Sequence, residues 1–179
     1  MVYYTIYLVG QMTSNPETFS WRQRVANYFF DNSNIHVIDP GSSLFDRHLL
    51  RASKENNQLF NSQAIATDAR LLVAKDRYYV KTANCLFINL NVYTPERPIL
   101  GSYFELAWAY DCPEKMKIGI YTGDRTKAFH CMHPFVDQAI QTWVQDEIEA
   151  CKLLEYHVHN KIFVPEDVLD ERVTKKSAQ

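Results

Sequence analysis

Residues 98–110, which read PILGSYFELAWAY, decide the fold that we expect. They follow a short run of large apolar side chains at 86–90, and the two segments together predict a buried strand, a loop and a helix. Ser102 suits the N-cap of that helix, and Glu105, three residues later, completes an S-x-x-E capping box. The positive end of the helix dipole favours a carboxylate in the first turn, so we expect Glu105 to be an anion at neutral pH.

Strands and helices alternate on both sides of this stretch. The other predicted strands are short apolar runs bounded by turn residues, at 5–9, 35–38, 117–121 and 162–165. The other predicted helices carry apolar residues at helical spacing, at 16–29, 71–80 and 136–156, the last with a break near Trp143. This alternation predicts an α/β fold with a Rossmann- or flavodoxin-like parallel sheet of about five strands and helices on both faces.

Length and composition narrow the class of protein. The chain has 179 residues, of which 46% are hydrophobic, and we expect one domain over residues 1–165 and a polar C-terminal tail over 166–179. A formal net charge of -2 gives no reason to expect a nucleic acid or a membrane surface as partner. No apolar run approaches the length of a membrane helix, and no signal peptide pattern is visible. We therefore expect a soluble, cytoplasmic protein.

The cysteines and histidines give no sign of a metal site. Four cysteines are scattered without a C-x-x-C pair, which predicts free and mostly buried thiols. No cluster of His and Cys has the ligand spacing of a zinc site, and we expect neither a metal nor another cofactor.

The predicted topology brings three loops to one edge of the sheet. In parallel sheets, ligands bind beyond the carboxyl ends of the strands, near the point where the strand order reverses. The loops at 10–14, 39–41 and 89–102 should meet there, and Glu105 lies at the edge of the same crevice. This position favours a functional role for Glu105 over a capping role alone.

Three motifs occur in order along the chain: YLVG at 7–10, the run from Asp76 through Val80 to Asn84 before an apolar strand, and GSYFELAWA at 101–109. They resemble the opening strand and glycine turn, the D-x-x-x-(I/V)-x-x-(A/S)-(D/N) passage and the G-(T/S)-x-x-E nucleophile helix of the nucleoside 2-deoxyribosyltransferase family. Nucleotide N-glycoside hydrolases are relatives of this family. Together the anchors span roughly residues 5 to 122.

The resemblance implies a glycosyltransferase of nucleoside salvage that exchanges the base of 2′-deoxyribonucleosides. Glu105 would attack C1′ and form a covalent 2-deoxyribosyl ester, as carboxylates do in retaining glycosidases. Asp76 would protonate the departing ring nitrogen, and Tyr7 would donate a hydrogen bond that orients Glu105. The candidate substrate-binding residues lie in the converging loops and are Gly10, Gln11, Asp39, Asp46, Asn89, Gly101 and Ser102.

The same resemblance implies nucleosides and free nucleobases as partners and a homo-oligomer built from dimers, as large as a tetramer or hexamer. The segment 41–70 shows no clean period, and we expect it to cover the base through Phe45, Asp46 or His48. The chain departs from the family at Ile99, where members carry an aspartate. It departs again at 130–135, which lacks the asparagine that a neighbouring subunit supplies in the family, and His133 is the candidate substitute.

Two alternatives stay open. A 2′-deoxynucleoside 5′-monophosphate N-glycoside hydrolase would bind its phosphate at 10–11, at 101–102 and at the N-terminus of the Glu105 helix. A non-catalytic nucleotide-binding module would use the same crevice, with Glu105 as a helix cap only. The sequence contains no G-x-G-x-x-G motif, which argues against dinucleotide binding.

Overall fold

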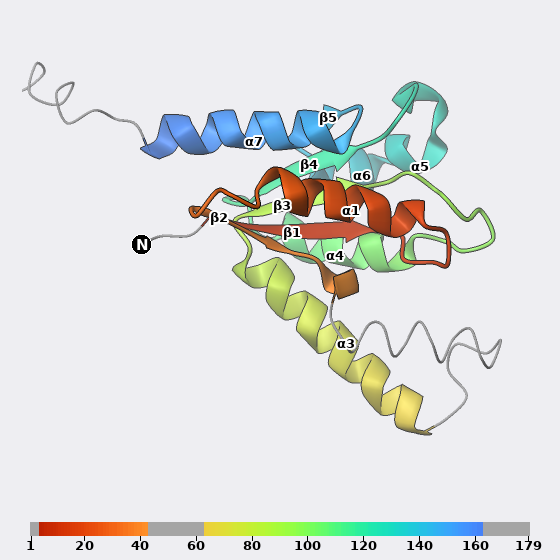
Figure 1. Ribbon diagram of the computed structural model, residues 1–179. Coiled ribbons are helices and arrows are strands. Elements are labelled where there is room, and N and C mark those ends of the chain that lie inside the picture. The colour runs from red at the N-terminus through yellow and green to blue at the C-terminus, as the bar shows by residue number, and fades with distance from the viewer. Residues whose placement is uncertain (1–3, 43–62, 163–179) are drawn as a thin grey trace, which may run out of the picture.

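Five short apolar segments form one parallel sheet in the computed structural model, which describes residues 4–42 and 63–162 (Figure 1). The strands are β1 (Tyr4–Gly10), β2 (Ile35–Ile38), β3 (Cys85–Asn89), β4 (Met116–Ile120) and β5 (Thr142–Val144). Their order is β2-β1-β3-β4-β5, and every neighbouring pair is parallel. This is the flavodoxin-like order, which places the reversal of strand order between β1 and β3. The predicted α/β fold is confirmed.

Helices cover both faces of the sheet. One face carries α1 (Glu17–Tyr28) and α7 (Glu147–Ile162), which pack against each other. The other face carries α3 (Gln63–Thr82), α4 (Leu100–Tyr110) and α6 (Pro134–Ala139) (Figure 1). Shorter elements complete the described chain: η1 (Pro40–Ser42), η2 (Arg125–Lys127) and α5 (Phe129–Met132).

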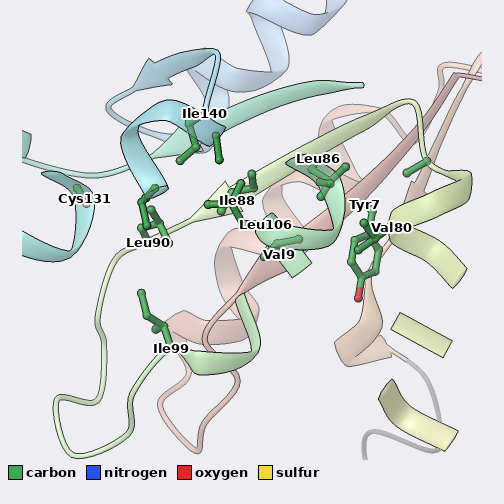
Figure 2. Close-up of a cluster of buried hydrophobic side chains, with 14 of the residues drawn as sticks. Tyr7, Val9, Val80, Leu86, Ile88, Leu90, Ile99, Leu106, Cys131 and Ile140 are labelled. Atoms are coloured by element: carbon green, nitrogen blue, oxygen red, sulfur yellow. The ribbon is translucent and has the colours of Figure 1, made fainter. Parts of the chain in front are cut away.

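The two faces bury alternate residues of each strand, as the pleat requires. In β1, Ile6 and Leu8 pack toward α1 and α7, whereas Tyr7 and Val9 pack toward α3 and α4. Figure 2 shows Tyr7 and Val9 in the second of these clusters, together with Leu106 of α4. The parity of β1 therefore directs the Tyr7 side chain to the face that also carries α3 and α4.

The helix predicted at 136–156 is broken near Trp143 as expected, but the break contains a strand, β5, between α6 and α7. Trp143 of β5 lies beside Gly119 of β4 and covers it so closely that a Cβ on Gly119 would come within 2.7 Å of the indole ring. Glycine at 119 leaves room for the indole ring. The hydrophobic periodicity of residues 136–156 could not reveal this contact, because it joins two strands that are far apart in the sequence.

Two further boundaries differ from the prediction. Helix α3 starts at Gln63, eight positions before the predicted 71, and Ile162 ends α7 instead of opening an edge strand. The remainder of that predicted strand and the tail at 166–179 lie outside the described residues.

The four cysteines carry free thiols, and those of Cys85, Cys131 and Cys151 are buried. No helix in the described parts of the chain is both long and apolar enough to cross a membrane.

Candidate active site

Glu105 lies within α4 and not at its start. The helix begins at Leu100 after an N-cap at Ile99 that provides no side-chain hydrogen bond, and Ser102 is a buried residue inside the helix. The predicted capping box is therefore wrong. Because the N-cap of α4 is Ile99, three residues before the predicted Ser102, Glu105 lies beyond the first turn, where the helix dipole has little effect on a side chain.

The Glu105 carboxyl is buried, with 9% of its surface exposed. Burial raises its pKa from 4.5 to about 8, and the hydrogen bond from Tyr7 opposes part of this rise. The prediction that Glu105 is an anion at neutral pH is therefore wrong. The free-energy cost of removing the carboxylate from water is larger than the stabilisation of the carboxylate by Tyr7 and the nearby cations. A carboxyl with this titration behaviour is typical of functional sites.

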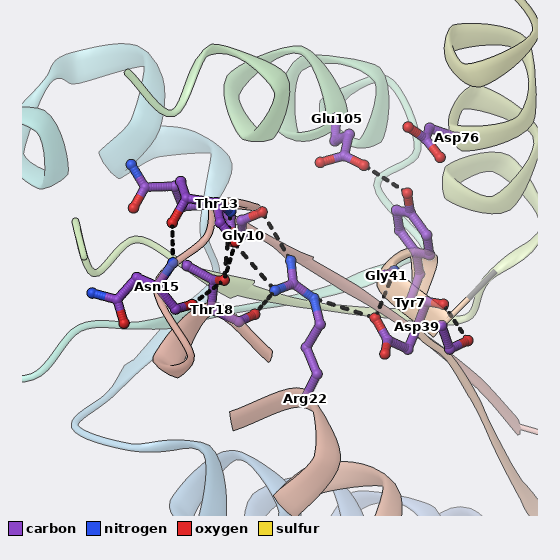
Figure 3. Close-up of polar contacts among 12 residues, drawn as sticks. Tyr7, Gly10, Thr13, Asn15, Thr18, Arg22, Asp39, Gly41, Asp76 and Glu105 are labelled. Carbon is purple, nitrogen blue, oxygen red and sulfur yellow. Dashed lines mark hydrogen bonds and ion pairs between the residues drawn. The ribbon is translucent and has the colours of Figure 1, made fainter. Parts of the chain in front are cut away.

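The side chains of Tyr7 from β1 and Asp76 from α3 approach Glu105 of α4 (Figure 3). The Tyr7 hydroxyl donates a hydrogen bond of 2.6 Å to Glu105 Oε1. The acidic side chains of Glu105 and Asp76 raise the pKa of Tyr7, by charge and hydrogen bonding, beyond the rise caused by its burial. Tyr7 lies in the middle of β1, and its ring is long enough for the hydroxyl to reach α4. The expected Tyr7–Glu105 hydrogen bond is present.

Two cations that the sequence did not single out accompany this cluster. Lys75 precedes Asp76 on α3, and its ammonium group lies 3.6 Å from Asp76 Oδ1. Arg22 of α1 is 1% exposed, and it shares the apolar face of its helix with Trp21 and Val25. In the sequence, Arg22 could have been identified because it is a charged residue on an otherwise apolar helix face. Lys75 could have been identified because it is next to the acidic Asp76.

Arg22 binds the turn that follows β1. Its guanidinium donates to the backbone carbonyls of Gly10 at 2.9 Å and Gln11 at 3.3 Å, and also to that of Thr18. Its Nε lies 3.3 Å from Asp39 Oδ1, so the ends of β1 and β2 are tied together (Figure 3). The predicted loop convergence at the carboxyl edge of the sheet is present in the described residues.

The Gln11 side chain holds the loop that leads from β3 to α4. Its Nε2 donates to the carbonyls of Thr94 and Arg97 at 2.9 and 2.6 Å, and its Oε1 accepts from the N–H groups of Tyr93 and Thr94. Because an amide offers two donors and two acceptor lone pairs, this side chain is saturated. Contact between Gln11 and a substrate would therefore use its backbone.

Gly10, Asn89 and Asp39, also predicted to bind substrate, lie at the same edge. Gly10 and Asn89 face each other in the β1–β3 register, and a Cβ on Gly10 would come within 3.1 Å of the Asn89 carbonyl oxygen, so this close approach favours glycine. Asp39 accepts from the N–H of Gly41 at 2.9 Å. Gly101 is exposed, and an added Cβ there would meet no atom within 4 Å. Asp46, with Phe45 and His48, lies outside the described residues.

A separate apolar groove of about 810 Å³ runs between α4 and the α5–α6 segment. Tyr103, Leu106 and Tyr110 line it from α4, and Phe129 and Phe135 line it from the opposite side. Neither Glu105 nor Asp76 lines this groove, so it is distinct from the carboxylate cluster. In the described part of the chain, no group of three or more His, Cys, Asp or Glu residues is arranged to hold a metal ion.

Replacing Tyr7 by Phe removes the hydroxyl that stabilises the Glu105 carboxylate, while the ring still fills its place in the core. We expect the titration midpoint of Glu105 to rise by about one pH unit, because a hydrogen bond to a charged group is lost. Carbon-13 NMR of the Glu105 carboxyl measures this midpoint. Tyr28→Phe is the control, because Tyr28 donates to Glu155 at 3.0 Å, outside the cluster. An unchanged midpoint in Tyr7→Phe would contradict the electrostatic role of the hydroxyl.

Comparisons with known proteins agree with this fold. No protein-family model matches the sequence, and no curated protein matches it. A conserved protein from Enterococcus faecalis V583 aligns in structure with a TM-score of 0.56 and 14% identity, over 87% of this chain and 99% of its own. A 2-deoxyribosyltransferase from the psychrotolerant bacterium Bacillus psychrosaccharolyticus aligns with a TM-score of 0.53 and 16% identity, over 82% of this chain and 89% of its own. At these identities the likeness shows a shared fold.

Proposed function

We propose that this chain is a nucleoside 2-deoxyribosyltransferase and a member of that family, which exchanges the base of 2′-deoxyribonucleosides through a 2-deoxyribosyl–Glu105 ester. The observation that carries the proposal is the cluster of Glu105, Tyr7 and Asp76 beside the β1–β3 reversal point. The fold shared with the Bacillus enzyme and the order of the three sequence motifs support it. The proposal includes nucleosides and free bases as partners, and a cytoplasmic homo-oligomer.

The chemistry of base exchange asks for these residue types. Glu105, as a carboxylate, attacks C1′ through an oxocarbenium-like transition state. The departing ring nitrogen needs a proton, because a base anion is a poor leaving group, and Asp76 is the second acid within reach. Tyr7 orients Glu105 through its hydrogen bond of 2.6 Å. A second base then attacks the ester from the face that the first base left, so the product keeps its configuration at C1′.

A base-exchange assay tests the proposal. We expect the protein, incubated with thymidine and free adenine, to produce 2′-deoxyadenosine that chromatography resolves from both substrates. A panel of deoxyribonucleosides and bases covers the range of possible preferences. Release of free base and deoxyribose without exchange would favour the hydrolase. Absence of turnover with every nucleoside and 5′-monophosphate would favour the non-catalytic binding module.

A further inference from the structure

The titration of Glu105 raises a question about its chemistry. A nucleophile must be ionised when it attacks, but burial raises the pKa of Glu105 to about 8, so the resting group carries a proton at neutral pH. The departing base needs a proton at the same moment. A transfer of the Glu105 proton toward the base would meet both needs, provided that a route exists and that another group holds the negative charge at rest.

The geometry provides the route. The Tyr7 hydroxyl donates to Glu105 Oε1 at 2.6 Å, and Asp76 is near enough for its charge and hydrogen-bonding capacity to raise the pKa of Tyr7. A tyrosine hydroxyl can accept one proton while it donates another, so it can connect two carboxyl groups. Figure 3 shows Asp76 extending from α3 toward the same hydroxyl that contacts Glu105.

Lys75 favours the negative charge on Asp76 over the negative charge on Glu105. Its ammonium group lies 3.6 Å from Asp76 Oδ1, and both side chains are 18% exposed, so solvent screens this attraction only in part. Within residues 4–42 and 63–162, the other groups that affect the pKa of Glu105 are Tyr7 from β1, Arg22 from α1 and Asp76 from α3. Of the two cations, Arg22 is engaged by Asp39 and backbone carbonyls, whereas Lys75 contacts Asp76 directly.

We propose that Lys75 is a positioning residue that keeps Asp76 as the charged member of the pair, so that the proton shared by the two carboxyls rests on Glu105 until a nucleoside binds. This inference rests on the proposed function for its chemical step. The Tyr7 hydroxyl first turns its hydrogen from Glu105 to Asp76. Glu105 then gives its proton to the Tyr7 oxygen while Tyr7 gives its own to Asp76, which leaves Glu105 ionised and Asp76 neutral. Glu105 then bonds to C1′ as the C1′–N bond breaks, and the base nitrogen keeps that electron pair and takes the proton from Asp76.

Carboxyl carbon-13 NMR tests the charge distribution without any substrate. The Glu105 and Asp76 signals are assigned by their loss in Glu105→Gln and Asp76→Asn. In the wild type we expect only the Glu105 carbon to titrate near pH 8. In Lys75→Met both carbons should titrate together, at a midpoint about one pH unit higher, because the pair then shares its proton without a neighbouring cation.

Two variants separate charge from structure. Lys75→Arg keeps the cation and should keep the wild-type titration, whereas Lys81→Met removes an exposed lysine from the same helix and should change nothing. Lys75→Gln is the second neutral variant if Lys75→Met does not fold. The proposal is overturned if Asp76 titrates with Glu105 in the wild type, or if neither carbon responds in the neutral variants.

The pH profile of base exchange then connects the titration to catalysis. We expect the alkaline limb of the Lys75→Met profile to move upward by the same amount, with Lys75→Arg restoring it. A higher KM with an unmoved profile would overturn the proposal and make Lys75 a substrate contact. A shifted NMR titration in a protein that exchanges no base would sustain the role of Lys75 and overturn the proposed function alone.

Discussion

Glu105→Gln is expected to lose at least ~10²-fold in the rate of base exchange, on the scale that removal of a catalytic group produces. Glutamine keeps the size of the side chain and can still accept the hydrogen bond from Tyr7, so the cluster retains its shape. What it lacks is a carboxylate that can form an ester with C1′. The rate is measured by chromatography under single-turnover conditions, which separates the chemical step from product release.

Glu147→Gln is the matched control for this variant. Glu147 is also 9% exposed, but it lies on α7 and pairs with Arg24, on the opposite face of the sheet. We expect its exchange rate to stay near that of the wild type. A folded Glu105→Gln protein with the same rate as Glu147→Gln would remove Glu105 from the mechanism. Mass spectrometry of acid-quenched wild type should locate a deoxyribosyl group on the peptide that contains Glu105.

Glu105→Gln should also change how the free energy of unfolding depends on pH. Because the pKa of Glu105 is raised from 4.5 to about 8, the native protein holds the proton more tightly than the unfolded chain. The stability that this proton provides is fully present below pH 4.5 and is lost as the pH rises through about 8. Glu105→Gln does not titrate, so urea unfolding should show the wild type losing stability relative to the variant across this window.

The fold could be predicted because its information is local. Short apolar runs at β1, β2, β3 and β4, separated by helical periods, indicate a parallel sheet without knowledge of any long-range contact. β5 could not be found in this way. Its central Trp143 is specified by the space above Gly119, which lies on a strand more than twenty residues earlier.

The sequence motifs identified the side chains that lie together at Glu105, but the sequence did not predict their electrostatics. The motifs singled out Glu105, Asp76 and Tyr7, and the structure brings these three together. The protonation of Glu105 depends on how deeply α4 buries it, and that depth depends on a helix start that the Ser102 pattern misplaced. Lys75 was not predicted for the same reason, since only the packing of α3 against α4 turns an ordinary charge pair into part of the site.

Arg22 connects the stability of the fold to the site. Its guanidinium satisfies carbonyls at the turn after β1 and pairs with Asp39 at the end of β2. It also lowers the pKa of Glu105, against the larger effect of burial. One buried cation therefore fixes the edge of the sheet on which the loops converge, and it favours the ionised form of Glu105.

Arg22→Met should destabilise the protein by about 3–5 kcal/mol, because it leaves Asp39 without this partner and removes the donor to buried backbone carbonyls. Urea unfolding at neutral pH measures the change. Arg24→Met is the control: Arg24 lies two positions away and is 47% exposed, so its ion pairs should contribute at most about 1 kcal/mol. Adding Asp39→Asn to Arg22→Met should restore part of the loss, since the partner is then neutral. A loss in Arg22→Met no larger than that in Arg24→Met would mean that this network does not hold the first turn in place.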